Sequence, residues 1–419
     1  MKHLVFFIAL FANILYVNIS AFWGGPNTDG SNMTYKLYCI VVFFVFIFFY
    51  TKQYFNKKIY GQHVISVLIL LFYIICGVLS GYAKDVTTLC LIAYCLPATG
   101  IAVFYAEDQS INKMVKWIDV FLPVLSISMI FSLKILLNKV LEGTNFYSQS
   151  LSYDASYCFL LYLFFLLFGN EYDRFSFFKS KFYKIISIIM LPYLLSVLFF
   201  SGGRGALGTI IVGALYLLYM YHRNYKIKLS MVLRLSIVAI AFVVLLLFYL
   251  PEESVEPLTR NFNRVFSFFD TSASMYERTS GRDEALNVAI SQISQSPIFG
   301  NGIFSYKDSY FVKTDLTYPH NIVLEVLLQG GVLFLLLFGL VMLKLFYRFK
   351  RIFKVKSQMI IVLIGIFSFT KLLYSDSYME NPFFWFFVMY LYNVKIPKHG
   401  VEPKYQTMLK KAEINNKTY

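Results

Sequence analysis

Long apolar stretches follow one another along most of this chain, and they constrain its fold more than any other feature. A helix needs about 20 residues to cross the hydrocarbon core of a bilayer. Twelve stretches approach or exceed this length, so we expect an all-α, polytopic integral membrane protein with twelve transmembrane helices. The stretches lie near residues 4–23, 35–51, 64–82, 86–105, 117–137, 151–169, 184–200, 204–222, 231–250, 321–347, 357–375 and 378–394.

The spacing of these stretches divides the chain into four parts. Within the long polar loop 251–320, near residues 281–295, apolar residues at helical spacing predict an amphipathic helix. We expect it to lie on the membrane surface or to roof a chamber. Its apolar stripe consists of Leu286, Ala289, Ile290 and Ile293. The parts are 1–250 with helices one to nine, the long polar loop 251–320, 321–394 with helices ten to twelve, and a basic tail at 395–419.

Charge gives the expected orientation. With 58% hydrophobic and 15% charged residues, the chain does not have the composition of a soluble globule. The Lys and Arg residues behind its net charge of +15 gather beside apolar stretches, which favours a cytoplasmic location for them rather than a nucleic-acid partner. Both termini are then cytoplasmic, and the 251–320 loop is periplasmic. The five cysteines lie in apolar stretches without metal-ligand spacing, so we expect neither disulfides nor a metal site.

Several polar residues are predicted in the outer halves of helices. A charge at mid-bilayer costs about 2.5–3.5 kcal/mol, so such residues face a protein interior or a water-filled cavity. Together they indicate a polar chamber that opens outward, although Lys134 and Lys371 could instead extend to the interface. The residues are Lys134, Asp154, Arg204, Glu325 and Lys371.

The turn Ser201-Gly202-Gly203-Arg204-Gly205 joins two predicted helices on the outer face. Gly202 and Gly203 allow a close approach of backbone N–H groups to a ligand, and Arg204 adds a forked donor at a helix start. The turn therefore suits a phosphate or diphosphate. The alternative is a tight hairpin with an interfacial arginine.

The long loop carries further arginines. Arg282 stands at the positive end of the predicted amphipathic helix, where an anion would be favoured. Arg260, Arg264 and Arg278 precede it and are further candidates for binding an acidic ligand. The alternative is that Arg278 and Arg282 pair with neighbouring acidic residues on a solvated face.

His320 is the only one of the five histidines predicted on the outer face. It opens the tenth predicted helix together with Asn321, and Glu325 lies about one turn deeper. Because an imidazole can take up a proton near neutral pH, His320 is a candidate catalytic residue, with Asn321 and Glu325 as candidate substrate contacts. A histidine at a helix start can also serve as a cap or an interfacial residue.

These motifs resemble the O-antigen ligase and O-antigen polymerase superfamily of bacterial envelope glycosyltransferases. The resemblance covers about residues 201–340. Phe334 stands where the ligases tend to have a small or polar residue, whereas the Arg-x10-Gly spacing of some polymerases is absent after Arg204 and Arg264. The motifs that carry the resemblance are the glycine-arginine turn, Arg282–Leu286, Ser296–Gly302, and His320-Asn321 followed by Gly331.

The resemblance implies a glycosyltransferase of the bacterial inner membrane that uses a lipid-diphosphate-linked glycan, with no nucleotide sugar, metal or other cofactor. Arg204 and Arg282 would bind the diphosphate and His320 would take the acceptor's proton. We expect a polymerase that joins undecaprenyl-diphosphate-linked repeat units, with a chain-length regulator and a flippase as partners. A ligase that moves finished glycan to lipid A core or protein, and a transporter of lipid-linked oligosaccharide, are the alternatives.

Overall fold

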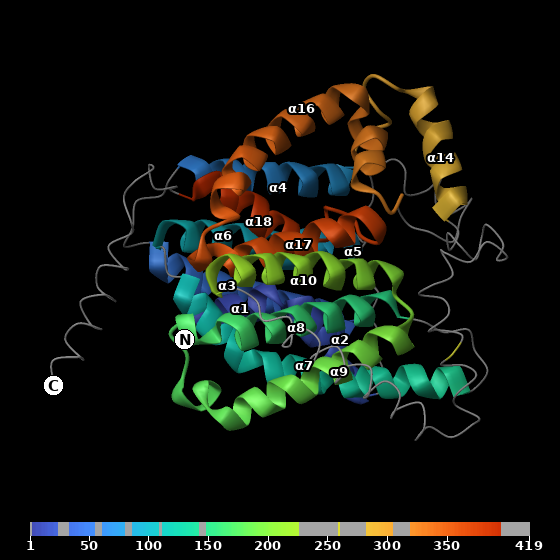
Figure 1. Ribbon diagram of the computed structural model, residues 1–419. Coiled ribbons are helices and arrows are strands. Elements are labelled where there is room, and N and C mark those ends of the chain that lie inside the picture. The colour runs from blue at the N-terminus through green and yellow to red at the C-terminus, as the bar shows by residue number, and fades with distance from the viewer. Residues whose placement is uncertain are drawn as a thin grey trace.

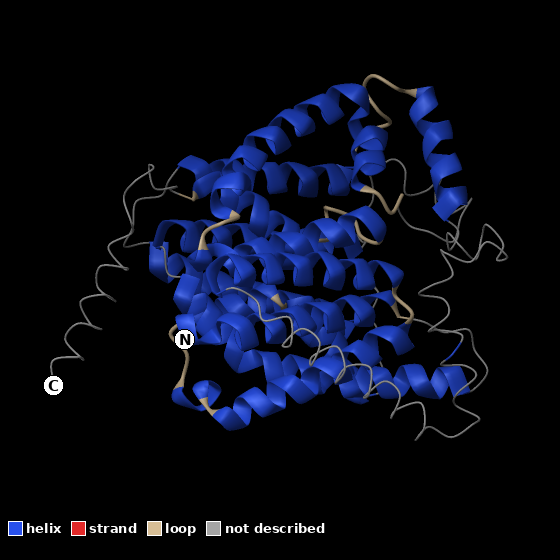
Figure 2. Ribbon diagram, viewed as in Figure 1, coloured by secondary structure: helices blue, strands red, loops and turns tan. Residues whose placement is uncertain are grey.

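The computed structural model of the chain describes residues 2–23, 33–54, 61–79, 86–108, 111–141, 148–225, 259, 282–304 and 319–394. These residues form helices and connecting turns, and no strand occurs among them (Figure 2). The prediction of an all-α protein is confirmed. Most of the helices run side by side along one direction, while α14 (Arg282–Gln295) crosses that direction at one end of the bundle (Figure 1).

The remaining helices follow in chain order. The first half contains α1 (Lys2–Leu10), α2 (Ala12–Ser20), α3 (Met33–Tyr54), α4 (Gly61–Leu79), α5 (Val86–Cys90), a π-helical segment (Leu91–Cys95), α6 (Leu96–Asp108) and α7 (Ile111–Leu141). The second half contains α8 (Gln149–Phe168), α9 (Lys181–Ser201), α10 (Arg204–Tyr225), α16 (Ile322–Ile352), α17 (Met359–Tyr374) and α18 (Pro382–Asn393). Short 3-10 turns occupy Ala21–Trp23, Gly169–Glu171, Ser176–Lys179 and Lys356–Gln358.

Eight helices of the described part are long and apolar enough to cross a membrane. The pair α1 and α2, bent by 71°, raises the number to nine if it forms one span. The chain is therefore a multi-pass membrane protein, but the predicted number of twelve helices is not confirmed. The predicted stretch 231–250 lies outside the described residues, and the 12-residue α18 is too short to cross a bilayer core at about 1.5 Å per residue.

α8 lies at the centre of the bundle. It packs against α7, α9 and α10, and 83% of its apolar segment is buried, as expected for a helix that is apolar on all sides. Tyr157 of α8 stacks on Phe367 of α17 with ring centres 4.5 Å apart, and Phe383 of α18 packs edge-on against Tyr157. By contrast, only 22% of the apolar segment of α3 is buried, which leaves its other faces for lipid.

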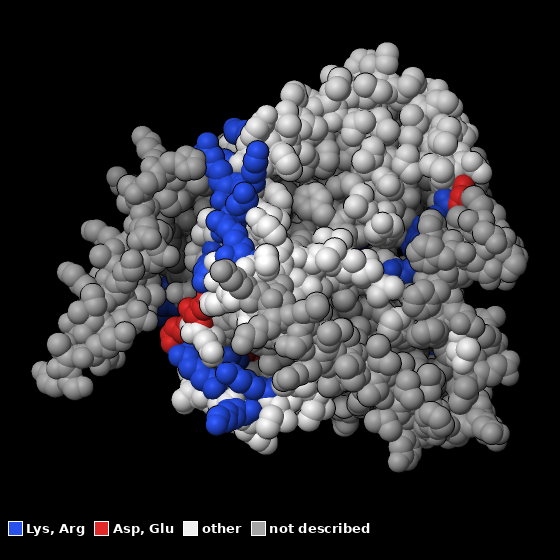
Figure 3. Space-filling view, viewed as in Figure 1, with Lys and Arg blue, Asp and Glu red and all other residues white. Residues whose placement is uncertain are grey.

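Charged side chains distinguish the two ends of the bundle. In Figure 3, Lys and Arg form a band at one end, with a few acidic residues among them. At this end, Lys116 pairs with Asp173 at 3.1 Å and Lys356 pairs with Glu171 at 3.2 Å. We call it the basic end, and we call the other the pocket end, where α8, α10 and α14 begin and α17 ends. This asymmetry is the pattern on which the predicted orientation was based, and the orientation itself stays a prediction.

α16 breaks in its first third. Gly330 and Gly331 have non-helical backbone angles, and the φ of 62° at Gly331 lies in the left-handed region. The turn after α14 pairs with this break through its backbone: the N–H of Asn301 donates to the Leu328 carbonyl at 2.8 Å, and the N–H of Val332 donates to the Pro297 carbonyl at 2.9 Å. We call Pro297–Gly302 and Leu328–Leu333 together the backbone seam. It attaches α14 to α16.

α14 occupies the range in which an amphipathic helix was expected, but the expected stripe is not buried as a unit. Ala289 is fully buried, whereas Leu286 and Ile290 are 42% and 54% exposed. The helix instead packs through Ala285 and Ala289 against Leu328 of α16. The small alanine side chains allow the two helices to approach closely. Ile293 packs against the same contact, whereas Leu286 and Ile290 remain exposed.

Candidate active site

The glycine-arginine turn connects α9 to α10 at the pocket end. Gly202 adopts a left-handed conformation with φ 74°, which few residues other than glycine accept. The N–H of Gly203 donates to Ser152 Oγ of α8 at 3.0 Å, and a Cβ at Gly203 would lie 2.3 Å from the Ser152 Cβ. The two glycines therefore let the turn lie directly on α8. The Gly203 N–H that was expected to face a ligand is used inside the fold.

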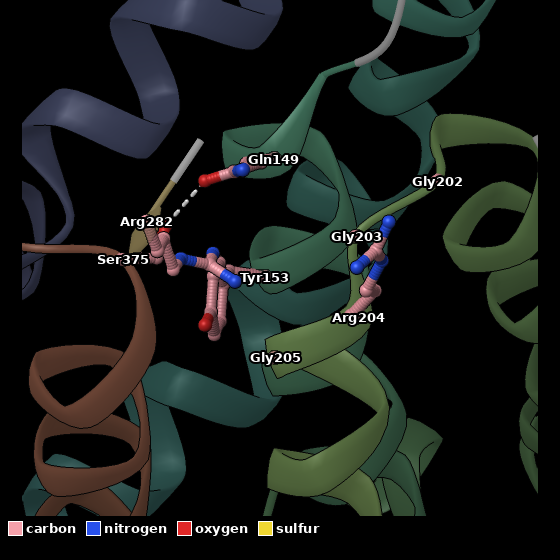
Figure 4. Close-up of a pocket in the computed structure, with 8 residues that line it drawn as sticks. All are labelled: Gln149, Tyr153, Gly202, Gly203, Arg204, Gly205, Arg282 and Ser375. Carbon is pink, nitrogen blue, oxygen red and sulfur yellow. Dashed lines mark hydrogen bonds between the residues drawn. The ribbon is translucent and has the colours of Figure 1, made fainter. Parts of the chain in front are cut away.

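Arg204 and Arg282 line the same pocket (Figure 4). Arg204 is the first residue of α10 and Arg282 is the first residue of α14, so both stand at helix N-termini, whose dipoles add positive charge. Both side chains are half-buried, and no Asp or Glu is among the described residues that line this pocket. Two arginines that are 78 positions apart in the sequence are thus brought together in one electropositive site.

Three residues that were not predicted complete the pocket: Gln149 and Tyr153 of α8, and Ser375 after α17. Ser375 Oγ donates to Gln149 Oε1 at 2.6 Å, which links α8 to the end of α17 (Figure 4). A polar side chain at a helix end was the only signal for Gln149 and Ser375. Tyr153 has the appearance of an interfacial aromatic, so composition gave no reason to select it.

His320 interacts electrostatically with Arg282, the second predicted catalytic arginine. Burial and the positive charge of Arg282 lower the pKa of His320 from 6.5 to about 4, so its imidazole is neutral at physiological pH. Its backbone is left-handed, with φ 53°, a conformation that costs a non-glycine residue about 1–3 kcal/mol and persists where the surroundings fix it. The three predicted catalytic residues therefore lie in one neighbourhood.

Asn321 and Glu325, the two predicted substrate contacts of α16, make contacts within the fold. Asn321 caps α16, since its Oδ1 accepts hydrogen bonds from the N–H groups of Val323 at 2.9 Å and Leu324 at 3.3 Å. Glu325 is buried, and its carboxylate accepts hydrogen bonds from Ser377 Oγ and from the Tyr378 N–H. Neither residue lines the pocket with the arginines.

The loop Ser375–Asn381 joins α17 to α18 and ties the pocket end together. Asp376 pairs with Lys371 of α17 at 3.1 Å and accepts a hydrogen bond from Asn381 at 2.9 Å. The Tyr378 hydroxyl donates to Gln329 of α16. The loop therefore connects the helix that begins after His320 to the wall of the pocket that carries Ser375.

The other predicted polar residues have separate positions. Lys371 does not extend to the interface but forms the ion pair with Asp376. Asp154 is buried, accepts a hydrogen bond from Asn18 of α2 at 3.2 Å and does not line the pocket. Lys134 is exposed on α7. The candidate anion-binding residues Arg260, Arg264 and Arg278 lie outside the described residues.

Within the described ranges, no group of three or more His, Cys, Asp or Glu side chains could hold a metal ion. Residues 185–339 match a family model described as O-antigen ligase. The resemblance to the O-antigen ligase and polymerase superfamily is confirmed. The matched range contains Arg204, Arg282 and His320.

No curated protein and no solved structure matches this chain. The O-antigen ligase family supports a role in the assembly of O-antigen or a related surface polysaccharide, and an enzyme of the glycosyltransferase type. The match extends from the start of α9 to the middle of α16, so it spans the glycine-arginine turn, α14 and the backbone seam.

Proposed function

We propose that this protein polymerises lipid-linked repeat units of a surface polysaccharide. The donor is a glycan on undecaprenyl diphosphate, and the acceptor is a second lipid-linked repeat unit. The observation that carries the proposal is the convergence of Arg204 and Arg282 on one pocket beside a neutral His320. A cationic pocket next to a proton acceptor has the two properties that transfer from a diphosphate to a hydroxyl requires.

The reaction uses each group in a defined step. The acceptor hydroxyl oxygen attacks the anomeric carbon of the donor sugar, and the bond from that carbon to the diphosphate oxygen breaks. The hydroxyl proton passes to the neutral imidazole of His320. Undecaprenyl diphosphate leaves with the bonding electrons, and Arg204 and Arg282 stabilise the negative charge that grows on it. One well-placed donor of this kind accounts for about 10²–10³ in rate.

The proposed location follows from the charge asymmetry of the bundle. We assign the basic end to the cytoplasm, together with both termini, and the pocket end to the periplasmic face of the inner membrane. Substrates reach that face after a flippase has moved them across, and a chain-length regulator would set when polymerisation stops. Because the diphosphate bond is already activated, the reaction needs no nucleotide.

The test is a deletion of this gene in its host, complemented with plasmid copies that carry Arg204→Ala, Arg282→Ala or His320→Ala. Arg223→Ala serves as the matched control, since Arg223 is an exposed arginine at the basic end that donates to the Lys354 carbonyl at 2.9 Å. Gel electrophoresis of the surface glycan measures chain length, and a tagged copy measures expression in the membrane.

A polymerase predicts that deletion leaves single repeat units on the glycan acceptor, that the three site variants fail to restore the ladder, and that Arg223→Ala restores it. Collapse to bare acceptor without any repeat unit would favour the ligase instead. Normal chain lengths in all three site variants would refute the assignment of the active site.

A further inference from the structure

A second cavity lies beside the break in α16, and it differs from the arginine pocket in chemistry. Its walls are mainly apolar side chains of α4 and α16, and its volume is about 580 Å³. The lining includes Leu68, Phe72, Ile303, Gln329 and Phe334. Both helices lie at the surface of the bundle, and Figure 1 shows the second part of α16 arching away from the bundle above α4. We call this cavity the α4–α16 groove.

The backbone seam creates this groove. Gly330 and Gly331 interrupt the helical backbone of α16, and the turn after α14 pairs with the break through backbone hydrogen bonds. Gly330 lines the groove with its backbone, because glycine has no side chain. One wall of the groove therefore comes from the backbone seam and the broken helix α16, which lie in the family-matched range, and the other wall comes from α4, which lies outside it.

One loop joins the groove to the arginine pocket. Ser375 lines the pocket, and three residues later Tyr378 donates to Gln329, a residue of the groove wall. The Tyr378 hydroxyl also contacts the hydroxyl of Tyr73, another wall residue, at 3.1 Å. Because an extended chain covers at most about 3.6 Å per residue, the Cα atoms of Ser375 and Tyr378 are within about 11 Å of each other. A single molecule can therefore span both sites.

We propose that the α4–α16 groove holds the first isoprene units of the polyisoprenoid chain whose diphosphate occupies the arginine pocket. This proposal rests on the proposed function. The apolar walls suit a hydrocarbon chain, and the polar pocket at the end of the loop suits its charged head. Since lipid tails are as apolar as the walls, the groove adds little hydrophobic affinity. Its contribution is position: it fixes the chain so that the diphosphate lies between Arg204 and Arg282.

Site-specific photo-crosslinking tests the proposal. Benzoylphenylalanine replaces Phe72 in the groove or, as the control, Phe44 of α3, which is also exposed but does not line the groove. The protein is reconstituted in phospholipid nanodiscs with radiolabelled undecaprenyl diphosphate and irradiated. We expect labelling at position 72 well above that at position 44. Excess unlabelled undecaprenyl diphosphate should abolish it, whereas excess phospholipid should not.

A second arm joins the groove to the pocket. Arg204→Ala in the position-72 protein should strongly reduce labelling, because the chain loses its fixed head. Equal labelling at positions 72 and 44, or equal competition by phospholipid, would show that the groove holds ordinary membrane lipid and would overturn the proposal. So would specific labelling that Arg204→Ala leaves unchanged, since head and chain would then not be bound together.

The result is separable from failure of the proposed function. If the Arg204→Ala copy restores a normal ladder in cells while labelling at position 72 is specific and depends on Arg204, lipid diphosphate binds as proposed here but polymerisation by this pocket is refuted. A wall substitution gives a further readout. Leu68→Trp, which fills the groove, should lower turnover of the lipid-linked donor, whereas Leu336→Trp, at a similarly exposed leucine of α16 outside the groove, should not.

Discussion

Arg174 and Arg204 are the same residue type at opposite ends of one bundle, and their surroundings differ in kind. Arg174, at the basic end, holds Asp119 through two hydrogen bonds of 2.6 and 2.9 Å, and its side chain is only 2% exposed. The rings of Phe165 and Tyr183 pack against its guanidinium group. Arg204 is half-buried and, with Arg282, lines a pocket whose described lining contains no carboxylate.

The difference separates a structural arginine from a candidate functional one. At Arg174 the fold itself supplies the anion, so the charge is matched inside the protein and nothing further can bind. At the pocket, two guanidinium groups line a cavity whose described walls carry no carboxylate, so the site attracts an anionic ligand. A buried arginine that is paired with a buried carboxylate stabilises the fold, whereas two arginines that converge on a cavity favour an anionic ligand.

The largest effect is expected at the basic end. Arg174→Ala leaves the Asp119 carboxylate buried without its partner, and breaking a buried pair in this way costs about 3–5 kcal/mol of folding free energy. We expect a large drop in the thermal unfolding temperature of the detergent-purified protein, or loss of monodisperse protein. Arg204→Ala should leave unfolding nearly unchanged while polymer formation fails.

Lys116→Ala is the control for this prediction. Its partner Asp173 is largely exposed, so this pair contributes only about 0–1 kcal/mol. If Arg204→Ala lowered the unfolding temperature as much as Arg174→Ala, the distinction between the two arginines would fail.

The sequence predicted the members of this comparison unevenly. Arg204 and Arg282 were selected because each stands at the start of a predicted helix, where an anion is favoured, and His320 because it is the only histidine predicted on the outer face. Gln149 and Ser375 were missed, because the pocket is assembled from four distant segments and a neutral polar residue at a helix end carries no such signal. The helix at 282–295 follows from local periodicity, whereas its buried face depends on contact with α16, which no local pattern contains.

Arg282 depends on the backbone seam for its position, because α14 is attached to α16 there. Gly331→Ala places a Cβ about 2.3 Å from the Ile298 carbonyl oxygen in a left-handed conformation. We expect a loss of about 1–3 kcal/mol in stability and a parallel loss of transferase activity as α14 moves. Thermal unfolding and polymer length measure the two effects.

Gly339→Ala is the matched control in the same helix. A Cβ there meets nothing within 4 Å, and alanine is favoured over glycine in a helix by up to about 1 kcal/mol. Gly339→Ala should therefore be neutral or slightly stabilising with normal activity. Identical behaviour of the two variants would show that the seam does not hold Arg282 in place.

The smallest expected effect is on the pH dependence of the reaction rate. Its fall at acidic pH, the acidic limb, reports the pKa of His320 and the influence of Arg282 on it. The folded protein lowers the pKa of His320 to about 4, mainly through burial and secondly through Arg282. Below pH 6.5 the imidazole of His320 is protonated in the unfolded chain but stays neutral in the folded protein until pH reaches about 4. His320 therefore lowers the free energy of unfolding as pH falls from 6.5 to about 4, and it has no effect above pH 6.5. A reaction that needs the neutral imidazole should run at constant rate from pH 8 to about 5 and fall to half near pH 4.

Arg282→Gln removes the smaller of the two causes that lower the pKa of His320. The midpoint of the acidic limb should therefore rise above pH 4 but stay below 6.5, because the burial of His320 remains. Initial rates of the purified enzyme on a lipid-linked substrate, each variant scaled to its own plateau, measure the limb. Arg223→Gln, at the basic end, should leave it unchanged. A wild-type limb near pH 6.5 would place His320 in contact with bulk water, and a limb that Arg282→Gln does not move would separate the histidine from the arginine pocket.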